Sequence, residues 1–405
     1  MASKVSSSTI AILILSCGLI SCDSAAGGRR PNNSGATIFN VMSYGAKPGT
    51  EEESSQAFVL AWRAACSFDR KAMVLIPPGV YILGETTFQG PCKNPTPVTV
   101  RLEGTLRAFS DLSAYPEKGW ISFDEVSGLV LTGRGTIDGQ GQNLWKYNDC
   151  DQDPNCKHLP ASIYMTKVQN AWITSLKLIN SMGFHMHVTN SERIVLRGLT
   201  ITAPRDSPNT DGIHISKSRD VKVIRCIVKT GDDCISIGQG SSNVTVSMVT
   251  CGPGHGISVG SLGKVPNELD VQGLLVNNCT LISTNNGVRI KTYPASDPSK
   301  ASGIVFADIV MEDVGNPIVI NQNYGLKSTQ PSMVKISDVT YHNIRGTTTS
   351  PVAVSLICSS GAPCLDIRLH NINLKLKGSG EVSSVCSNAI VAHVGVQIPP
   401  PCVSF

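Results

Sequence analysis

Residues 209–215 read NTDGIHI, with a carboxylate just before an Ile-x-Ile pair. The pattern returns as GDDCISI at residues 231–237 and as GHGISV at residues 254–259. The apolar pairs begin 22 residues apart each time (235 − 213 and 257 − 235), which indicates one structural unit stacked repeatedly. Asp211, Asp232-Asp233 and His255 fall at one point of this period, and this favours acid/base residues on neighbouring coils.

Similar apolar doublets continue the repeat in both directions, and a short apolar-alternating strand precedes each of them. These further doublets are Phe184/Met186, Val288/Ile290, Ile318/Ile320 and Val352/Val354. Short strands at such a period predict an all-β parallel β-helix, in which each coil buries its apolar edge against the next. The alternative is a β-sandwich, whose strands recur about every 8–12 residues and need no common register.

The repeat has recognisable early coils and a cap. Residues 101–106 and 133–139 resemble earlier coils of the same solenoid. Residues 50–66 carry a helical pattern, and the positions spaced for one face are Ala57, Leu60, Ala61 and Ala64. We expect a short N-terminal helix that covers the open end of the solenoid, where strand edges would otherwise be exposed.

Both ends of the chain carry further signals. An apolar run at residues 10–20 follows Lys4 and precedes small residues, which predicts a cleaved secretory signal over residues 1–26. The run is too short to span a membrane, which needs about 20 apolar residues. Residues from Gly378 onward are interpreted as a C-terminal cap or tail. No linker interrupts residues 27–405, so we expect one catalytic domain, acting as a monomer.

Charge and glycosylation signals agree with an extracellular protein. The net charge is +4 without a basic run or interleaved aromatic residues, so nucleic acid is not an expected partner. Sequons at Asn32, Asn243 and Asn278 fit the secretory route. We therefore expect a secreted, extracellular protein.

The cysteines predict disulfides. Cys17 and Cys22 of the fourteen lie in the signal segment, and the other twelve favour disulfides in a secreted chain. Spacing and coil register predict the pairs Cys66–Cys92, Cys150–Cys156, Cys234–Cys251, Cys358–Cys364 and Cys386–Cys402. Cys226 and Cys279 lie two coils apart, too far for a disulfide, and are expected to be buried thiols. No cysteine or histidine spacing suits zinc, so no metal or cofactor is expected.

Register assigns each polar side chain to a face. Alternate residues of a strand point opposite ways, so inward Ile213 and Ile215 leave His214 and Ser216 pointing outward. The column of His214 then contains Ser236, Ser258 and Arg289, and that of Ser216 contains Gly238, Gly260 and Lys291. Neighbouring coils are about 4.8 Å apart. The repeat therefore gathers six charged or titratable residues on one face: Asp211, Asp232, Asp233, His255, Arg289 and Lys291.

Each of these residues has an ordinary structural explanation when taken alone. Asp before Gly is a common turn residue, Asp232-Asp233 fits an exposed acidic pair, and a cation fits a solvated face. Their coincidence in register favours function, because stacked carboxylates repel each other and raise at least one pKa. Carboxylates of unequal pKa suit glycoside hydrolysis, and adjacent cations suit an anionic sugar.

Four motifs carry a resemblance to a known family. SPNTDG at residues 207–212, GDDC at 231–234, GHG at 254–256 and RIK at 289–291 match, in order, the signatures of the polygalacturonases. These are the pectin-hydrolysing family 28 glycoside hydrolases. YGAK at 44–47 and GTIDGQG at 135–141 are similar to the plant members, and residues 148–157 resemble the exo-acting, pollen-type group.

The resemblance implies a right-handed parallel β-helix and an inverting, single-displacement hydrolysis of α-1,4-linked galacturonan, with exo action.

 By motif, Asp232 would be the general acid, Asp211 and Asp233 would position and deprotonate the water, and His255 would support the acid. Arg289 and Lys291 would bind the galacturonate carboxylate, with Asn209 and Tyr324 as further substrate contacts.

One departure from the family pattern concerns Tyr324. In many plant relatives the matching tyrosine is followed by a cysteine that pairs within a short loop, whereas residues 325–327 here read GLK. We therefore expect a looser loop beside Tyr324 than in those relatives. The alternatives to polygalacturonate hydrolysis are action on rhamnogalacturonan or xylogalacturonan, and an inactive β-helical wall-binding protein. A pectate lyase would need a calcium site and an arginine base, and the Asp-Asp-Cys and His-Gly motifs argue against it.

Overall fold

The computed structural model describes residues 35–148, 158–325 and 328–402. Residues Ala36–Phe405 form one compact unit. The predicted signal segment 1–26, the sequon at Asn32 and the predicted Cys150–Cys156 disulfide lie outside the described residues. Within the described part, no helix is both long and apolar enough to cross a membrane.

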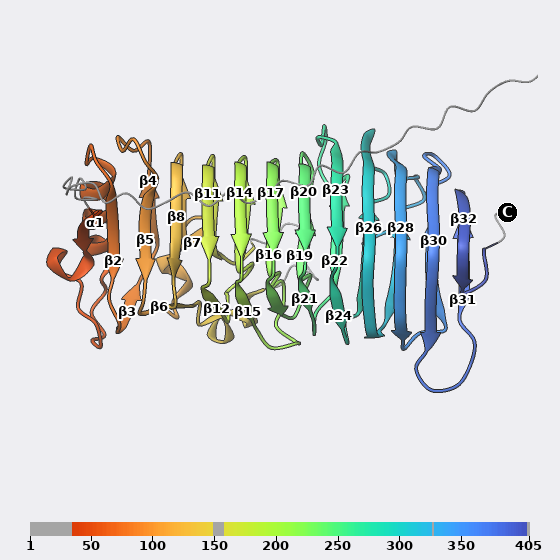
Figure 1. Ribbon diagram of the computed structural model, residues 1–405, viewed down its shortest axis with the longest axis horizontal. Coiled ribbons are helices and arrows are strands. Elements are labelled where there is room, and N and C mark those ends of the chain that lie inside the picture. Colours follow the sequence, from red (N-terminus) through yellow and green to blue (C-terminus); the bar gives the residue numbers. More distant parts are fainter. Residues whose placement is uncertain (1–34, 149–157, 326–327, 403–405) are drawn as a thin grey trace, which may run out of the picture. The chain divides into compact units, whose positions relative to one another are not determined.

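Two parallel sheets wind into a right-handed β-helix (Figure 1). Each central coil gives one strand to an 11-stranded sheet and then two strands to a 21-stranded sheet. β16 (Ile213–Ser216), for example, is followed by β17 (Arg219–Ile224) and β18 (Ile227–Lys229), and β19 (Ile235–Ile237) begins the next coil. β16 pairs with β19, and β17 with β20 (Ser242–Ser247), all in parallel. The predicted parallel β-helix is confirmed, and the β-sandwich is excluded.

The strands of the smaller sheet follow chain order. Besides β16 and β19 they are β4 (Thr86–Gln89), β7 (Gly119–Asp124), β10 (Ala161–Thr166), β13 (Met186–Thr189), β22 (Ile257–Leu262), β25 (Asn286–Thr292), β27 (Asn316–Asn321), β29 (Val352–Ile357) and β31 (Ser383–Ser387).

The larger sheet begins with single strands and pairs of short strands, and ends with long ones. Besides β17, β18 and β20 it contains β1 (Thr37–Asn40), β2 (Ala72–Ile76), β3 (Val80–Leu83), β5 (Val98–Leu102), β6 (Thr105–Ala108), β8 (Ser127–Gly133), β9 (Thr136–Asp138), β11 (Gln169–Thr174), β12 (Lys177–Ile179), β14 (Glu192–Arg197), β15 (Thr200–Thr202), β21 (Thr250–Cys251), β23 (Val271–Asn277), β24 (Thr280–Ile282), β26 (Ser299–Val314), β28 (Val334–Thr348), β30 (Cys364–Leu376) and β32 (Ala389–Ile398). Both β23 and β24 pair with β26, so the two short strands of a coil merge into one from β26 onward.

The inward side chains form one continuous core. Ile213 and Ile215 align with Ile235 and Ile237 and are fully buried, as are the equivalent residues of β22, β25 and β27. Burying one such side chain is worth about 1.5–3 kcal/mol, which stacking supplies on every coil. The register therefore holds across the coils that carry the acidic motifs.

Two of the predicted doublets are wrong by two residues. In β13 the inward pair is Met186 and Val188, which align with Ile213 and Ile215, whereas Phe184 lies outside the strand. In β29 the inward pair is Val354 and Leu356, because Val354 aligns with Ile318. Apolar residues occur on the outer face at both places, so a pattern of apolar residues alone selects the wrong pair.

The predicted N-terminal helix is α1 (Ser55–Cys66), drawn at the β1/β2 end of the coils in Figure 1. Its buried face differs from the predicted one, because Leu60 is exposed and Ala64 is only half-buried. Phe58 and Trp62 are buried instead, and the Trp62 ring packs 5.2 Å from the Phe88 ring of β4. Aromatic residues thus seal the end of the solenoid.

The C-terminal segment is more regular than a tail. β31 pairs with β29, and β32 with β30, so residues after Gly378 add another coil to both sheets. The described disulfides are those predicted: Cys66–Cys92, Cys234–Cys251, Cys358–Cys364 and Cys386–Cys402. Cys226 and Cys279 are buried free thiols, as expected.

Candidate active site

The predicted acid/base residues lie in three turns that lead into β16, β19 and β22. These turns, here called the acidic turns, span residues 203–212, 230–234 and 252–256. Gly212 N donates to Asp233 O at 2.9 Å and Cys234 N to Gly256 O at 2.8 Å, so backbone bonds hold the turns in register. A Cβ on Gly256, whose φ is +92°, would lie 2.2 Å from Asn286 O, so glycine is required beside His255.

Asp233 is a buried carboxylate held by two cations. Its Oδ1 accepts hydrogen bonds from Arg289 Nη2 at 2.9 Å and Ser258 Oγ at 2.7 Å, and its Oδ2 accepts one from Lys291 Nζ at 2.8 Å. Burial alone would raise the pKa of Asp233, but the charges of Lys291 and Arg289 outweigh burial and hold that pKa below its usual value. Asp233 is therefore ionised at neutral pH.

Lys291 stays charged for the complementary reason. Burial alone would lower the pKa of Lys291, but the negative charge of Asp233 outweighs this and raises it. The ammonium also lies 4.9 Å from the centre of the Tyr324 ring, and the Arg289 guanidinium lies 5.7 Å from it. The prediction that Arg289, Lys291 and Tyr324 gather near the carboxylates agrees with these contacts.

Asp211 is buried without a cation in hydrogen-bond contact among the described residues. Its Oδ2 accepts a hydrogen bond from Ser236 Oγ at 2.7 Å. Burial, together with the negative charges of Asp232 and Asp233, raises the pKa of Asp211 well above its usual range. The expected raised pKa thus belongs to Asp211, which can hold a proton while Asp233 remains ionised.

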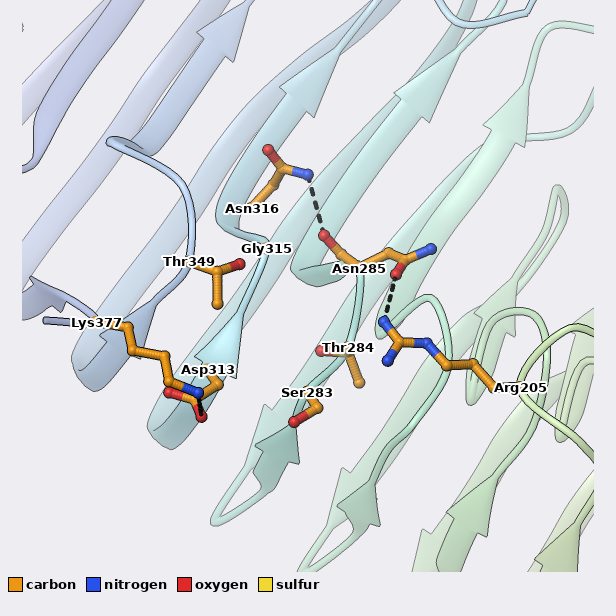
Figure 2. A pocket seen from close by; sticks show the side chains of 9 residues that line it. All are labelled: Arg205, Ser283, Thr284, Asn285, Asp313, Gly315, Asn316, Thr349 and Lys377. Carbon is orange, nitrogen blue, oxygen red and sulfur yellow. Dashed lines mark hydrogen bonds and ion pairs between the residues drawn. The ribbon is translucent and has the colours of Figure 1, made fainter.

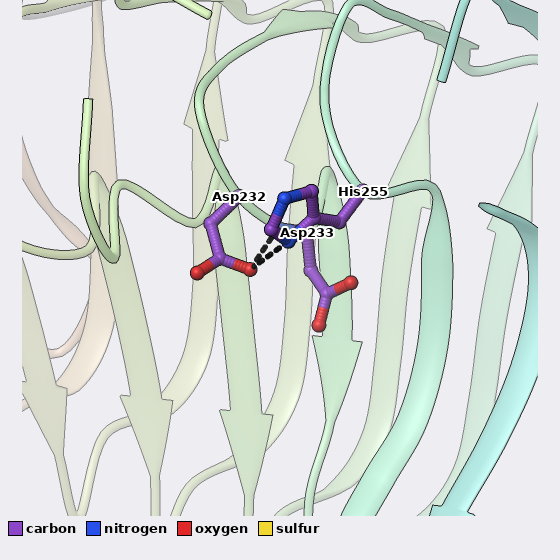
Figure 3. A group of neighbouring side chains, drawn as sticks. All are labelled: Asp232, Asp233 and His255. Atoms are coloured by element: carbon purple, nitrogen blue, oxygen red, sulfur yellow. Dashed lines mark hydrogen bonds and ion pairs between the residues drawn. The ribbon is translucent and has the colours of Figure 1, made fainter. Parts of the chain in front are cut away.

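Asp232 is the most open of the three carboxyl groups. Its side chain is 18% exposed, compared with 2% for Asp233. Asp232 Oδ1 lies 2.9 Å from His255 Nδ1, and Figure 3 shows this contact with Asp233 alongside. Asn209 Nδ2 also donates to Asp232 Oδ2, at 3.4 Å. Asn209 and His255 therefore contact the same carboxyl group from opposite oxygens.

The predicted column of Lys291 is wrong in one respect. Val259 pairs with Ile290, but Leu262 pairs with Thr292, so Gly260 and Ser261 together lie opposite Lys291. This bulge adds one residue to β22, and Lys291 has no single counterpart there. The column of His214, Ser236, Ser258 and Arg289 is confirmed by the strand register.

The cluster has the spacing of a cation site. Asp232, Asp233 and His255 offer ligand atoms within 4.8 Å of one another. Both oxygens of Asp233, however, already accept hydrogen bonds from donors that include Arg289 and Lys291. The positive charges of Arg289 and Lys291, in hydrogen-bond contact with Asp233, repel a divalent cation at the same carboxylate. The donor set therefore suits acid/base chemistry better than metal binding.

An aromatic cluster lies beside the acidic turns and was not predicted. The His214 ring stacks on Phe184 at 5.0 Å and meets His187 edge-on at 4.7 Å, and Tyr164 lies 4.9 Å from His187. Burial lowers the pKa of His214 to about 4 and that of His187 well below its usual value, so both rings are neutral at neutral pH. The outward register of β10, β13 and β16 was the signal that could have identified this cluster.

Family and sequence comparisons identify relatives over most of the chain. The family model described as glycosyl hydrolases family 28 matches residues 66–395. An exopolygalacturonase of Platanus acerifolia is 44% identical over 371 residues, covering 90% of this chain and 98% of the relative. An exopolygalacturonase of Arabidopsis thaliana is 41% identical and covers 93% of this chain and 91% of the relative.

The fold also matches solved structures. The endo-xylogalacturonan hydrolase of Aspergillus tubingensis superposes with a TM-score of 0.77 at 25% identity, covering 89% of this chain and 100% of that protein.

Proposed function

Because the chain belongs to family 28 of the glycosyl hydrolases, we propose that it cleaves the α-1,4 linkages of polygalacturonate. It is a glycoside hydrolase, and the exopolygalacturonases among its relatives support this substrate. The observation that carries the proposal is the contact of Arg289 and Lys291 with Asp233, beside two further carboxyl groups. This arrangement combines acid/base residues with cations that can attract a uronate.

The proposed mechanism is an inverting, single displacement. Asp232 is assigned as the general acid, because it is the carboxyl group most open to the glycosidic oxygen and contacts His255. Asp211 and Asp233 hold the attacking water from the other side. A raised pKa makes ionised Asp211 the stronger base of the two, and Asp211 takes the proton of the water as the new C–O bond forms. The proton from Asp232 leaves with the departing sugar hydroxyl.

Substrate binding is assigned to residues around these carboxyl groups. Arg289 and Lys291 would bind the carboxylate of a galacturonate unit, and the Tyr324 ring would cover both cations. Tyr293 contacts Tyr324 edge-on at 5.7 Å, which supports this ring where the cysteine loop of related enzymes is missing. Leu326 and Lys327 lie outside the described residues. Asn209 would contact the sugar next to Asp232.

We assign exo action to the aromatic cluster. Tyr164, Phe184, His187 and His214 lie on the outer face of the coil that carries Asp211 and of the two coils before it. These rings are bulky and carry no positive charge that would attract the carboxylates of further uronate units. The polymer would therefore extend from the site only toward the later coils, past Arg289.

A second candidate substrate is xylogalacturonan. The likeness to the endo-xylogalacturonan hydrolase of Aspergillus tubingensis at 25% identity favours it, but the relatives above 40% identity favour unbranched polygalacturonate. Product analysis on both polymers tests the proposal. Monomer released from polygalacturonate alone supports exo action on the plain polymer, a ladder of oligomers indicates endo action, and release only from xylogalacturonan contradicts the main proposal.

Location and maturation complete the proposal. The four described disulfides support action outside the cell. We propose that residues 1–26 are a cleaved secretory signal and that the enzyme works in the cell wall. A monomer suffices, because the assigned site residues all come from one chain.

A further inference from the structure

A polar pocket lies next to the acidic turns, and the residues that line it have no part in the proposed mechanism. It is formed by the four turns that continue the series of acidic turns: residues 283–285, 315, 349–351 and 377–382. Its volume is about 510 Å³, within the range of small-molecule sites. Figure 2 shows hydroxyl, amide and charged side chains around it.

Hydrogen bonds connect this pocket directly to the coil of His255. Asn285 N donates to Gly254 O at 2.8 Å, and Asn286 Nδ2 donates to His255 O at 3.4 Å. Gly315 N then donates to Thr284 O at 2.9 Å. The pocket therefore begins one coil beyond His255, about 4.8 Å further along the solenoid.

One cation of the pocket lacks an acidic partner. Arg205, from the first acidic turn, crosses to the pocket and donates to Asn285 Oδ1 at 3.5 Å (Figure 2). Among the described residues, no carboxylate pairs with it, whereas Lys377 pairs with Asp313 at 2.7 Å on the other side. A guanidinium without an ion-pair partner beside a polar pocket suits a carboxylate ligand, which it can bind through two parallel hydrogen bonds.

A buried hydroxyl gives a second, independent indication. Thr284 is 2% exposed and lines the pocket, and its Oγ1 has no hydrogen-bond partner among the described residues. A buried polar atom normally has a partner, supplied by protein, water or ligand. The floor of the pocket thus has an unused donor and acceptor, next to amide groups of Asn285 and Asn316 that match sugar hydroxyls.

We propose that this pocket is a distal binding site for the polymer itself, which holds a uronate unit other than the one bound by Arg289 and Lys291. The proposal rests on polygalacturonate being the substrate. Arg205 binds the uronate carboxylate, and the side chains of Asn285, Asn316 and Asp313 bind sugar hydroxyls. Because the polymer is proposed to extend toward the later coils, the pocket takes a unit on that side of the cleaved bond.

Binding of oligogalacturonates of different length tests this inference. In an Asp232→Asn background, which binds without cleaving, hexagalacturonate should bind more tightly than digalacturonate in calorimetry, with one oligomer per protein. Arg205→Gln should reduce this gain in affinity about tenfold, the worth of one charge-assisted hydrogen bond, and most strongly at low salt. Lys222→Gln, which removes an exposed charge from β17, is the matched control and should keep the full gain.

The outcomes separate the pocket from the proposed function. An equal gain in Arg205→Gln and in the parent would overturn the distal site, while release of galacturonate by the wild-type enzyme would leave the function intact. Binding of two oligomers per protein would overturn the view that one oligogalacturonate spans the active site and the distal pocket. If the wild-type enzyme released no sugar and the parent bound no oligomer, the proposed function would fail, and this inference with it.

Discussion

Asp211 and Asp233 occupy equivalent positions on adjacent coils, yet their pKa values move in opposite directions. Each accepts a hydrogen bond from a serine of the following coil, Ser236 for Asp211 and Ser258 for Asp233. The second group in contact with each serine differs: His214 Nδ1 lies 2.8 Å from Ser236 Oγ, whereas Arg289 Nε donates to Ser258 Oγ at 3.1 Å. A neutral ring beside one carboxyl and cations beside the other divide the pair into a proton acceptor and a fixed anion.

The assignment of Asp232 as the acid predicts a large loss of activity. Asp232→Asn should reduce release of reducing sugar from polygalacturonate by about 10²–10⁴-fold, since the leaving oxygen loses its proton donor. Circular dichroism should show an unchanged β-helix. Activity equal to wild type in a folded variant would exclude Asp232 from this role.

The raised pKa of Asp211 predicts a pH-dependent effect on stability. A carboxyl whose folded-state pKa exceeds its unfolded value near 3.9 contributes stability below about pH 4, and loses it as pH rises through the folded pKa. Asp211→Asn should therefore raise the free energy of unfolding by about 1–2 kcal/mol at pH 7, with a smaller gain at pH 4. Denaturant unfolding at both pH values measures this gain. A variant less stable than wild type at pH 7 would contradict the view that ionised, buried Asp211 destabilises the fold.

The ion pair of Lys291 with Asp233 predicts a coupled loss. Lys291→Met should destabilise the fold by about 3–5 kcal/mol, because it leaves a buried carboxylate with less compensation. Adding Asp233→Asn should restore part of this stability without restoring activity. Additive effects of the two substitutions in denaturant unfolding would show that the pair is not coupled.

The donor set around Asp233 predicts independence from metal ions. Since Arg289 and Lys291 already satisfy this carboxylate, activity on polygalacturonate should stay within about twofold after dialysis against a chelator. Initial rates before and after dialysis, and after adding back calcium, measure this. Loss of activity that calcium restores would instead support a cation bound by Asp232, Asp233 and His255.

The aromatic cluster predicts a change in products. Phe184→Ala removes the ring that stacks on His214 and should open the N-terminal side of the groove. Oligomers should then appear besides monomer among early products from polygalacturonate. Trp172→Ala, which removes an exposed ring of β11 on the other sheet, is the control and should release monomer only. Monomer alone from Phe184→Ala would assign exo action to other residues.

The central part of the site could be predicted from the sequence, because the hydrogen-bonded register of the parallel strands sets the spacing of its residues. The interval of 22 residues placed Asp211, Asp233 and His255 in one series of turns, and the structure agrees. Lys291 was misplaced because a bulge in β22 changes the count without changing the apolar pattern. Phe184 was misplaced because burial among other rings makes an outward apolar residue resemble a core residue.

Other features of the site could not be predicted from the periodic pattern of the sequence. Arg205 and Asn285 come together across 80 positions of sequence through the path of one long turn, which no local pattern encodes. The opposite pKa shifts of Asp211 and Asp233 depend on side chains one and two coils away. Such relationships follow from three-dimensional contacts rather than from residue type and spacing.

The coils differ in length between the middle of the solenoid and its C-terminal part. Aligned inward residues are 22 positions apart in the two coils of the acidic turns, but 31, 30 and 36 apart in the next three (Ile257, Val288, Ile318, Val354). The extra residues extend the longer strands and turns while the ladder spacing stays constant. We therefore expect insertions in the turns of the later coils to be tolerated, whereas a single residue inserted within β16, β19 or β22 would turn its side chains to the opposite face. The same architecture thus accepts inserted residues near its C-terminal end and does not accept them within the strands that position the reacting groups.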